Sequence, residues 1–348
     1  MTSRSFFTDI SWNKYRISPA FISLLKRVVL GLAIFHFIAQ FVIFLPVELA
    51  RTDTDRDTIV YFEAATRLKH NLDVYQPWPE YGVQMTPSRF FYSPVFLLLA
   101  RPLAELPFVD FARVWLILIF GAFWIYSFCL SRLAMGRWHW QSALVIGLVI
   151  DMFVEGHVAL SLGQFEPFMW ALFGLALTTR YRAGWLVLAT LTKIHPLWAL
   201  GLTLAQGGKK AWKSAALFAV PVIFLSWWMV GTHNWLMWWP SVQPVASQGT
   251  FHSSNWSLAF LGIRIFHWCG LLVASGSLPS WAKMYLSLCA VGAPLGMAFA
   301  ARKCSQEMRL ALVASAGVLF APLCWTDYFP LFLLPLAVWM GERRKVSE

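Results

Sequence analysis

The sequence predicts an all-α polytopic membrane protein, with residues 1–348 forming a single integral membrane domain. Of the 348 residues, 58% are hydrophobic and 13% are charged. A soluble domain has roughly twice that charged fraction. Apolar segments recur along the whole chain, and Lys plus Arg outnumber Asp plus Glu by 28 to 17. In a membrane protein this positive excess indicates topology and attraction to anionic headgroups, so membrane lipids are expected partners and nucleic acid is not.

Residues 28–47 are the first predicted transmembrane helix, because about 20 apolar residues are enough to cross the hydrocarbon core. Five basic residues precede this segment, namely Arg4, Lys14, Arg16, Lys26 and Arg27. By the positive-inside rule its N-terminal side is cytoplasmic, which places the following polar segment on the extracytoplasmic side. The N-terminal region is too polar for a secretory leader and has no small-residue cleavage signal, so the helix is expected to remain.

Residues 51–94 form the long extracytoplasmic loop, and within it residues 57–72 are predicted to form an amphipathic helix. Its apolar side recurs at helical spacing, at Tyr61, Ala64, Ala65, Leu68 and Leu72. Asp57 lies one turn before Tyr61 on that same side, where a carboxylate at a helix start would face lipid-borne molecules. The alternative is that Asp57 or Asp55 only caps the helix.

Residues 95–340 are expected to supply the remaining helix bundle, which gives about 9 to 12 transmembrane or partial helices in total. The further apolar segments are 95–106, 112–133, 143–154, 168–179, 184–205, 215–230, 256–274, 281–300, 309–321 and 328–340. The segment 184–205 joins two basic clusters, so it must return to the side it left. Pro196 interrupts helix continuity within it, and a re-entrant or broken hairpin is therefore expected there.

The order of several short motifs resembles glycosyltransferase family 87. The motifs are DTIVYFEAA at 57–65, LDVY at 72–75, FYSP at 91–94, GQFE at 163–166, KIHP at 193–196, NWSL at 255–258 with Arg264, and PLCWTDY at 322–328. Members of this family are integral membrane α-mannosyltransferases of the GT-C fold that use polyprenyl-phosphate-mannose. The chain departs from the family pattern at Glu166, where Asn is common, and at Asp327, where His is common.

The resemblance implies an inverting hexosyltransferase at the extracytoplasmic face of the plasma (inner) membrane, with Asp57 as the base. The implied substrates are a polyprenyl-phosphate sugar, with mannose as the expected hexose, and a glycolipid or glycan acceptor; no cofactor and no metal are expected. Cations suit the departing phosphate, and the candidates are Arg89, Arg264, His252 and Lys193. Polar side chains suit the sugar or acceptor, and the candidates are Tyr61, Tyr92, Gln164, Glu166, Asn255 and Asp327.

For several of these residues the alternative is a purely structural role. An arginine at the rim can extend to lipid headgroups, Lys193 can be interfacial, and Gln or Asn between membrane helices can serve as an interhelical hydrogen bond. Two other functions also remain open. A transporter or lipid flippase would have many helices with polar groups near the bilayer middle, and a catalytically silent scaffold is compatible with Asp327 in place of His.

Overall fold

The computed structural model describes residues 18–51, 57–75, 90–248, 251, 255–272 and 278–347. These residues are helical apart from turns and one isolated antiparallel bridge, between Asn255 and Trp325. Among them, four helical segments are long and apolar enough to cross a membrane: Ala20–Ala50, Phe108–Met135, Leu197–Gln243 and Ser280–Lys303. The all-α class expected from composition is therefore confirmed, whereas the total of 9 to 12 membrane helices stays a prediction.

The helices fall into three consecutive groups along the chain. The first is α1 (Pro19–Ala39), η2 (Gln40–Phe44), α2 (Leu45–Ala50), α3 (Thr58–Lys69), η3 (Pro94–Phe96), α4 (Leu97–Ala100) and η4 (Arg101–Glu105). The second is α5 (Phe108–Met135), α6 (Trp140–Met152), α7 (Val154–Ser161), α8 (Glu166–Thr178), α9 (Arg182–Thr192) and α10 (Leu197–Gln248). The third is α11 (Leu258–Trp268), α12 (Ser280–Ala300), η5 (Ala301–Lys303), α13 (Gln306–Leu319), η6 (Thr326–Phe332) and α14 (Leu333–Ser347).

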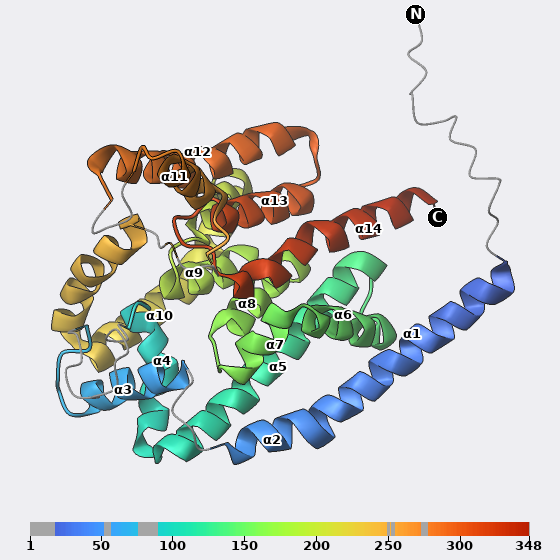
Figure 1. Ribbon diagram of the computed structural model, residues 1–348, viewed down its shortest axis with the longest axis horizontal. Helices are drawn as coiled ribbons and strands as arrows, with labels where there is room; N and C mark the ends of the chain where they lie inside the picture. Colours follow the sequence, from blue (N-terminus) through green and yellow to red (C-terminus); the bar gives the residue numbers. More distant parts are fainter. Residues whose placement is uncertain are drawn as a thin grey trace, which may run out of the picture.

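Helix α1 is an outer helix that runs along one edge of the bundle and contains most of the first span expected at 28–47 (Figure 1). It passes through the π-helical turn η2 into α2. Pro46 has no N–H to donate to the carbonyl one turn earlier, so the α-helical hydrogen-bond pattern is interrupted beside this turn. Phe35 and Val42 are 68% and 67% exposed. Large apolar side chains exposed on a candidate span suit a surface that faces lipid.

Helix α3 lies beyond α2 and contributes its apolar side to the core. Tyr61, Ala64, Ala65 and Leu68 are buried, at the helical spacing read from the sequence. Leu72 falls outside the helix and is 52% exposed, so its expected place on this face is wrong. The short turns η3, α4 and η4 that follow cover residues 94–105, which are too few to cross a bilayer as one straight helix.

Helix α5 is the central helix of the bundle, and it is the most buried of the four candidate spans. It packs against α6, α8 and α14. The hydroxyl of Tyr126 donates to the carbonyl oxygen of Pro330 at 2.6 Å, which ties the middle of α5 to η6. The rigid core helix thus fixes the position of the segment that carries Asp327.

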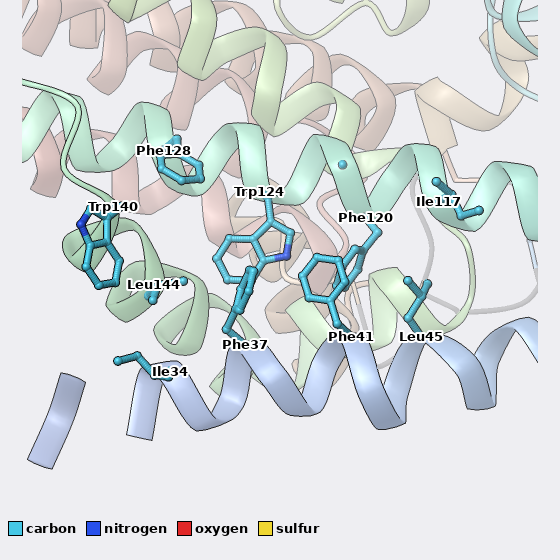
Figure 2. Close-up of a pocket in the computed structure, with 11 residues that line it drawn as sticks. Ile34, Phe37, Phe41, Leu45, Ile117, Phe120, Trp124, Phe128, Trp140 and Leu144 are labelled. Atoms are coloured by element: carbon cyan, nitrogen blue, oxygen red, sulfur yellow. The ribbon is translucent and has the colours of Figure 1, made fainter. Parts of the chain in front are cut away.

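An apolar groove of about 720 Å³ separates part of α1 from α5 and α6. Figure 2 shows Phe37 and Phe41 of α1 and η2 reaching toward Trp124 and Phe120 of α5, and these ring pairs lie 4.9 and 5.0 Å apart between centroids. Leu45 lies toward the end of the groove nearest α2. The groove is therefore a membrane-compatible apolar cleft along the first span.

Helices α9 and α10 form the broken hairpin expected for residues 184–205. The helix ends at Lys193, whose backbone is extended, and resumes at Leu197 after Pro196. The two helices pack side by side, and Arg180 and Arg182 line the same cavity as Lys210 and Ser214. Both basic clusters therefore lie at one end of the hairpin, and Lys193 lies at its tip.

Helix α10 is itself interrupted twice after the hairpin. Gly208 and Gly231 have φ of 52° and 81° with non-helical ψ, a backbone conformation that favours glycine. Helices α11 and α12 follow with a small apolar cluster of their own. Figure 1 shows α12 and α13 on the opposite side of the bundle from α1.

Candidate functional site

Asp57 lies immediately before α3, and its side chain faces the interior of the protein. It occupies the N-cap position but makes no capping hydrogen bond. Its carboxylate instead forms a hydrogen bond with Gln164, and its backbone N–H donates to the carbonyl oxygen of Leu162 at 3.0 Å. The capping interpretation of Asp57 therefore does not describe what this side chain does.

A tight turn between α7 and α8 holds Asp57 in this orientation. Gly163 has φ of +70°, and a Cβ atom there would lie 2.6 Å from Cγ2 of Thr58. The indole Nε1 of Trp115 donates to the carbonyl oxygen of Gly163 at 2.9 Å. The turn must therefore have glycine at this position, and α5 fixes it against the start of α3.

Lys193, at the tip of the α9–α10 hairpin, is the cation of the cluster. Its ammonium forms an ion pair with Glu166, the first residue of α8, and donates to the hydroxyl of Tyr328 at 2.8 Å. It also lies 4.8 Å and 5.0 Å from the ring centroids of Tyr92 and Tyr328. Because Glu166 is almost fully buried, this pair is shielded from bulk solvent and its charges depend on one another.

Two tyrosines connect the cation to the helix that follows Asp57. The hydroxyls of Tyr61 and Tyr92 lie 3.0 Å apart, and Tyr61 is buried. Their rings pack edge to face at 5.4 Å and both contact Phe96. The tyrosine pair therefore links α3, which begins just after Asp57, to the aromatic ring that lies beside the ammonium of Lys193.

Asp327 belongs to the same cluster through Glu166. Both carboxyl groups are buried, and they form a hydrogen bond with each other. Such a bond needs one proton between the two groups. Burial, followed by the charge of Glu166, raises the pKa of Asp327 well above its ordinary value, so the proton is assigned to Asp327. In this arrangement Asp327 is a neutral hydrogen-bond donor.

The pKa of Asp57 is raised above its ordinary value. Burial has the largest effect and raises it, the hydrogen bond with Gln164 lowers it, the charge of Glu166 raises it, and the ammonium of Lys193 lowers it. Asp57 thus lies within electrostatic range of both members of the ion pair. A carboxylate with a raised pKa is a better proton acceptor than a fully solvated one.

Asn255 holds together the loop segments that lead to Asp327. It is fully buried, and its Oδ1 accepts hydrogen bonds from the backbone N–H groups of Ser257 and Cys324 at 3.2 and 3.0 Å. Its Nδ2 donates to the carbonyl oxygen of Pro322 at 3.1 Å. Through these contacts Asn255 positions the segment 322–324, which leads to Asp327.

The other expected phosphate-binding residues are not brought to Asp57 by the contacts described so far. Arg264 lies half-buried on α11, with its guanidinium carbon 5.9 Å from the ring centroid of Phe260. Arg89 and His252 lie outside the described residues. Lys193 is therefore the expected phosphate-binding residue around which the described site is built.

Three residues of the site had no assigned function from sequence. Tyr328 contacts Lys193, Trp115 fixes the turn at Gly163, and the ring of His195 lies 5.1 Å from that of Tyr328. Tyr328 and His195 fall in motifs that carry the family resemblance, which was the available signal; Trp115 has none, since an aromatic residue in an apolar helix is ordinary. Within the described part of the chain, the buried atoms Oε1 of Gln164 and Nε2 of His195 have no hydrogen-bond partner, so a ligand could pair with them.

Comparison with known protein families identifies the family of this chain. The model of glycosyltransferase family 87 matches residues 90–326, which is more than half of the chain. The matched region includes Tyr92, Gln164, Glu166 and Lys193 of the cluster, whereas Asp57 and Tyr61 precede it and Asp327 and Tyr328 follow it directly. No curated protein and no solved structure matches the chain.

Proposed function

Because the chain belongs to glycosyltransferase family 87, we propose that this membrane glycosyltransferase moves a hexose, with mannose as the expected sugar, from a polyprenyl phosphate to a hydroxyl of a glycolipid or glycan. The observation that carries this proposal is the presence of Asp57 and Lys193 in one cluster. The Asp57 carboxylate, which makes no capping hydrogen bond, and the Lys193 ammonium, at the break between α9 and α10, lie within electrostatic range of each other. Transfer from a phosphate needs a base and a positive charge.

In the proposed reaction, the acceptor hydroxyl gives its proton to the Asp57 carboxylate while its oxygen attacks the anomeric carbon. The bond between that carbon and the phosphate oxygen breaks, and its electron pair leaves with the polyprenyl phosphate. A single displacement inverts the anomeric centre, so a β-linked phosphosugar yields an α-glycoside. Gln164 donates its amide N–H to the carboxylate, and its free Oε1 is suitably placed to accept a substrate hydroxyl.

Lys193 is the proposed partner of the departing phosphate. An ammonium has three N–H donors, and Glu166 and Tyr328 occupy two of them in the described structure. The third can reach a phosphate oxygen without breaking the ion pair. Arg89, Arg264 and His252 remain further candidates for the same phosphate, and Tyr61, Tyr92, Glu166, Asn255 and Asp327 for the sugar or acceptor.

The groove between α1 and α5 is where we place the polyprenyl chain. Its described lining is aliphatic, aromatic and glycine, and its volume of about 720 Å³ is in the range of ligand pockets. Ile117 lies at one end of the groove (Figure 2). It is at about the same level along α5 as Trp115, which contacts Gly163 beside Asp57 from the opposite, buried side of the helix. A chain in the groove would have its phosphate at the level of the site. The positive-inside rule places this end of the protein on the extracytoplasmic side.

The test is sugar transfer from radiolabelled polyprenyl-phosphate-hexose in membranes that contain the Asp57→Asn variant. Removing a general base lowers the rate by about 10²–10⁴-fold. Glu63→Gln is the matched control, because Glu63 lies on the same helix α3 but outside its buried face, and this variant should keep wild-type transfer. Wild-type activity of Asp57→Asn would reject the proposed base.

A further inference from the structure

A second polar cavity, of about 260 Å³, lies at the base of the α9–α10 hairpin. Helix α9 has 11 residues, so the cavity is about 16 Å along the helix from Lys193. Among the residues that line it are Thr179, Arg180, Arg182, Thr203, Lys210 and Ser214. The proposed transfer reaction uses none of them.

The lining of this cavity is strongly positive. Arg180, Arg182 and Lys210 contribute three positive charges, and no carboxylate is among the described lining residues. Arg182 is paired with Glu307 at 2.6 Å, whereas Arg180 and Lys210 form no ion pair within the described part of the chain. The side chains of Arg180 and Lys210 therefore give the cavity at least two positive charges that no carboxylate of the described residues neutralises.

The hydroxyl groups of the cavity are arranged as hydrogen-bond donors. The oxygen of Thr179 accepts from Nε1 of Trp185 at 2.8 Å, and the oxygen of Ser214 accepts from the N–H of Gly184 at 3.3 Å. Each hydroxyl proton is thereby left to point elsewhere. Thr203 is 4% exposed, and its Oγ1 has no partner among the described residues. A buried hydroxyl without a partner is costly unless a ligand satisfies it.

We propose that this cavity binds the phosphate of an anionic phospholipid headgroup. Cations and hydroxyl donors together match a group that offers only acceptor oxygens and negative charge. The neighbouring surface indicates a lipid source: Trp212 is 61% exposed two residues after Lys210, and Leu217 and Val220 are 63% and 65% exposed beyond it. Tryptophan gathers at headgroup depth, and basic cavities between membrane helices bind anionic headgroups there.

The site has a structural consequence for the hairpin. A phosphate held between Arg180, before α9, and Lys210, after the break at Gly208, would join both ends of the hairpin. Lys193 lies at the opposite tip, so the bound lipid would hold the segment that delivers the cation. The lipid site does not depend on the proposed reaction.

The test is native mass spectrometry of the full-length protein in detergent, titrated with dioleoyl-phosphatidylglycerol or dioleoyl-phosphatidylcholine. Arg180→Gln/Lys210→Gln should weaken phosphatidylglycerol binding about thirty-fold, since each basic side chain near a membrane surface contributes about five-fold. Arg302→Gln/Lys303→Gln is the charge-matched control in another basic cluster and should keep most of the binding. Thr203→Val, which removes only the buried hydroxyl, should weaken it several-fold.

Three results would overturn the proposal. Equal binding of phosphatidylcholine would show that the headgroup charge is not recognised. Equal losses in the two double variants would show that the whole basic surface, and not the cavity, attracts the lipid. Displacement of bound phosphatidylglycerol by millimolar inorganic phosphate, with phosphate retained on the protein, would identify a soluble anion as the ligand. Sugar transfer is not measured in any arm, so failure here leaves the transferase proposal to its own test.

Discussion

The ion pair between Lys193 and Glu166 is the part of the site whose removal gives the clearest prediction. In Lys193→Met the ammonium is lost, while the carboxylate of Glu166 stays in place with a side chain only 3% exposed. Removing one partner of a buried pair costs about 3–5 kcal/mol, because the other charge remains buried without compensation. The single variant should therefore be destabilised by that amount.

The double variant Lys193→Met/Glu166→Gln separates stability from chemistry. It removes both charges, and the glutamine amide oxygen still accepts the proton of Asp327. Stability should return to within about 1–2 kcal/mol of the wild type, since replacing both members of a buried pair is often nearly neutral. Sugar transfer should stay about 10²–10³-fold below wild type, because no cation then neutralises the departing phosphate.

Two measurements decide this prediction. Thermal unfolding of the detergent-solubilised protein reports the stability of the two variants, and transfer from radiolabelled polyprenyl-phosphate-hexose reports the chemistry. If Lys193→Met unfolds at the wild-type temperature, the pair is not buried as described. If the double variant regains transfer along with stability, Lys193 serves only the fold and the proposed phosphate contact is wrong.

Three further variants test the surroundings of Asp57 and Glu166. Gln164→Leu removes the hydrogen bond that lowers the pKa of Asp57, so the pKa of Asp57 should rise further. Because the base must be deprotonated, the acid limb of the plot of kcat/KM against pH should move to higher pH. An unchanged acid limb would contradict the assignment of Asp57 as the base. In Gly163→Ala, the positive φ alone should lower the free energy of unfolding by about 1–2 kcal/mol. Any further loss comes from the clash with Cγ2 of Thr58, so adding Thr58→Ser to this variant should restore part of that further loss. Asp327→Asn keeps a hydrogen-bond donor toward Glu166 and should unfold near the wild-type temperature. Asp327→Leu removes that donor and should lower the free energy of unfolding by about 1–3 kcal/mol. Equal stability of the two variants would show that Asp327 and Glu166 share no proton.

Local features of the fold could be predicted from sequence because local chemistry determines them. The spacing of Tyr61, Ala64, Ala65 and Leu68 gave the buried face of α3, and Pro196 with two flanking basic clusters gave the broken hairpin. The place of Leu72 was wrong because helical periodicity does not state where a helix stops. The chain turns at Asn71, whose φ is +57°, and Leu72 then leaves the buried face.

The contacts that orient the site could not be predicted in the same way, because they join distant parts of the chain. Lys193 and Tyr328 are separated by 135 residues, and Trp115 and Gly163 by 48. Each contact depends on which helices become neighbours, and hydrophobic periodicity does not specify that in a bundle whose helices are apolar on most sides. The hydrogen bonds of Asn255 to the backbone of Cys324 and Pro322 could not be predicted for the same reason, since they also join distant parts of the chain.

Asp327 stands where the resembled family commonly has histidine, and the charges of the cluster show what this exchange changes. A protonated Asp327 is a neutral donor toward Glu166, as a neutral imidazole would also be. A histidine can in addition take up a proton and become a cation when a phosphate arrives, whereas a carboxyl group can only become negative. Under the proposed function, the described cluster would therefore face the phosphate with the single positive charge of Lys193, partly offset by Glu166. It follows that loss of Lys193 should be more damaging in this chain than in a relative that retains the histidine.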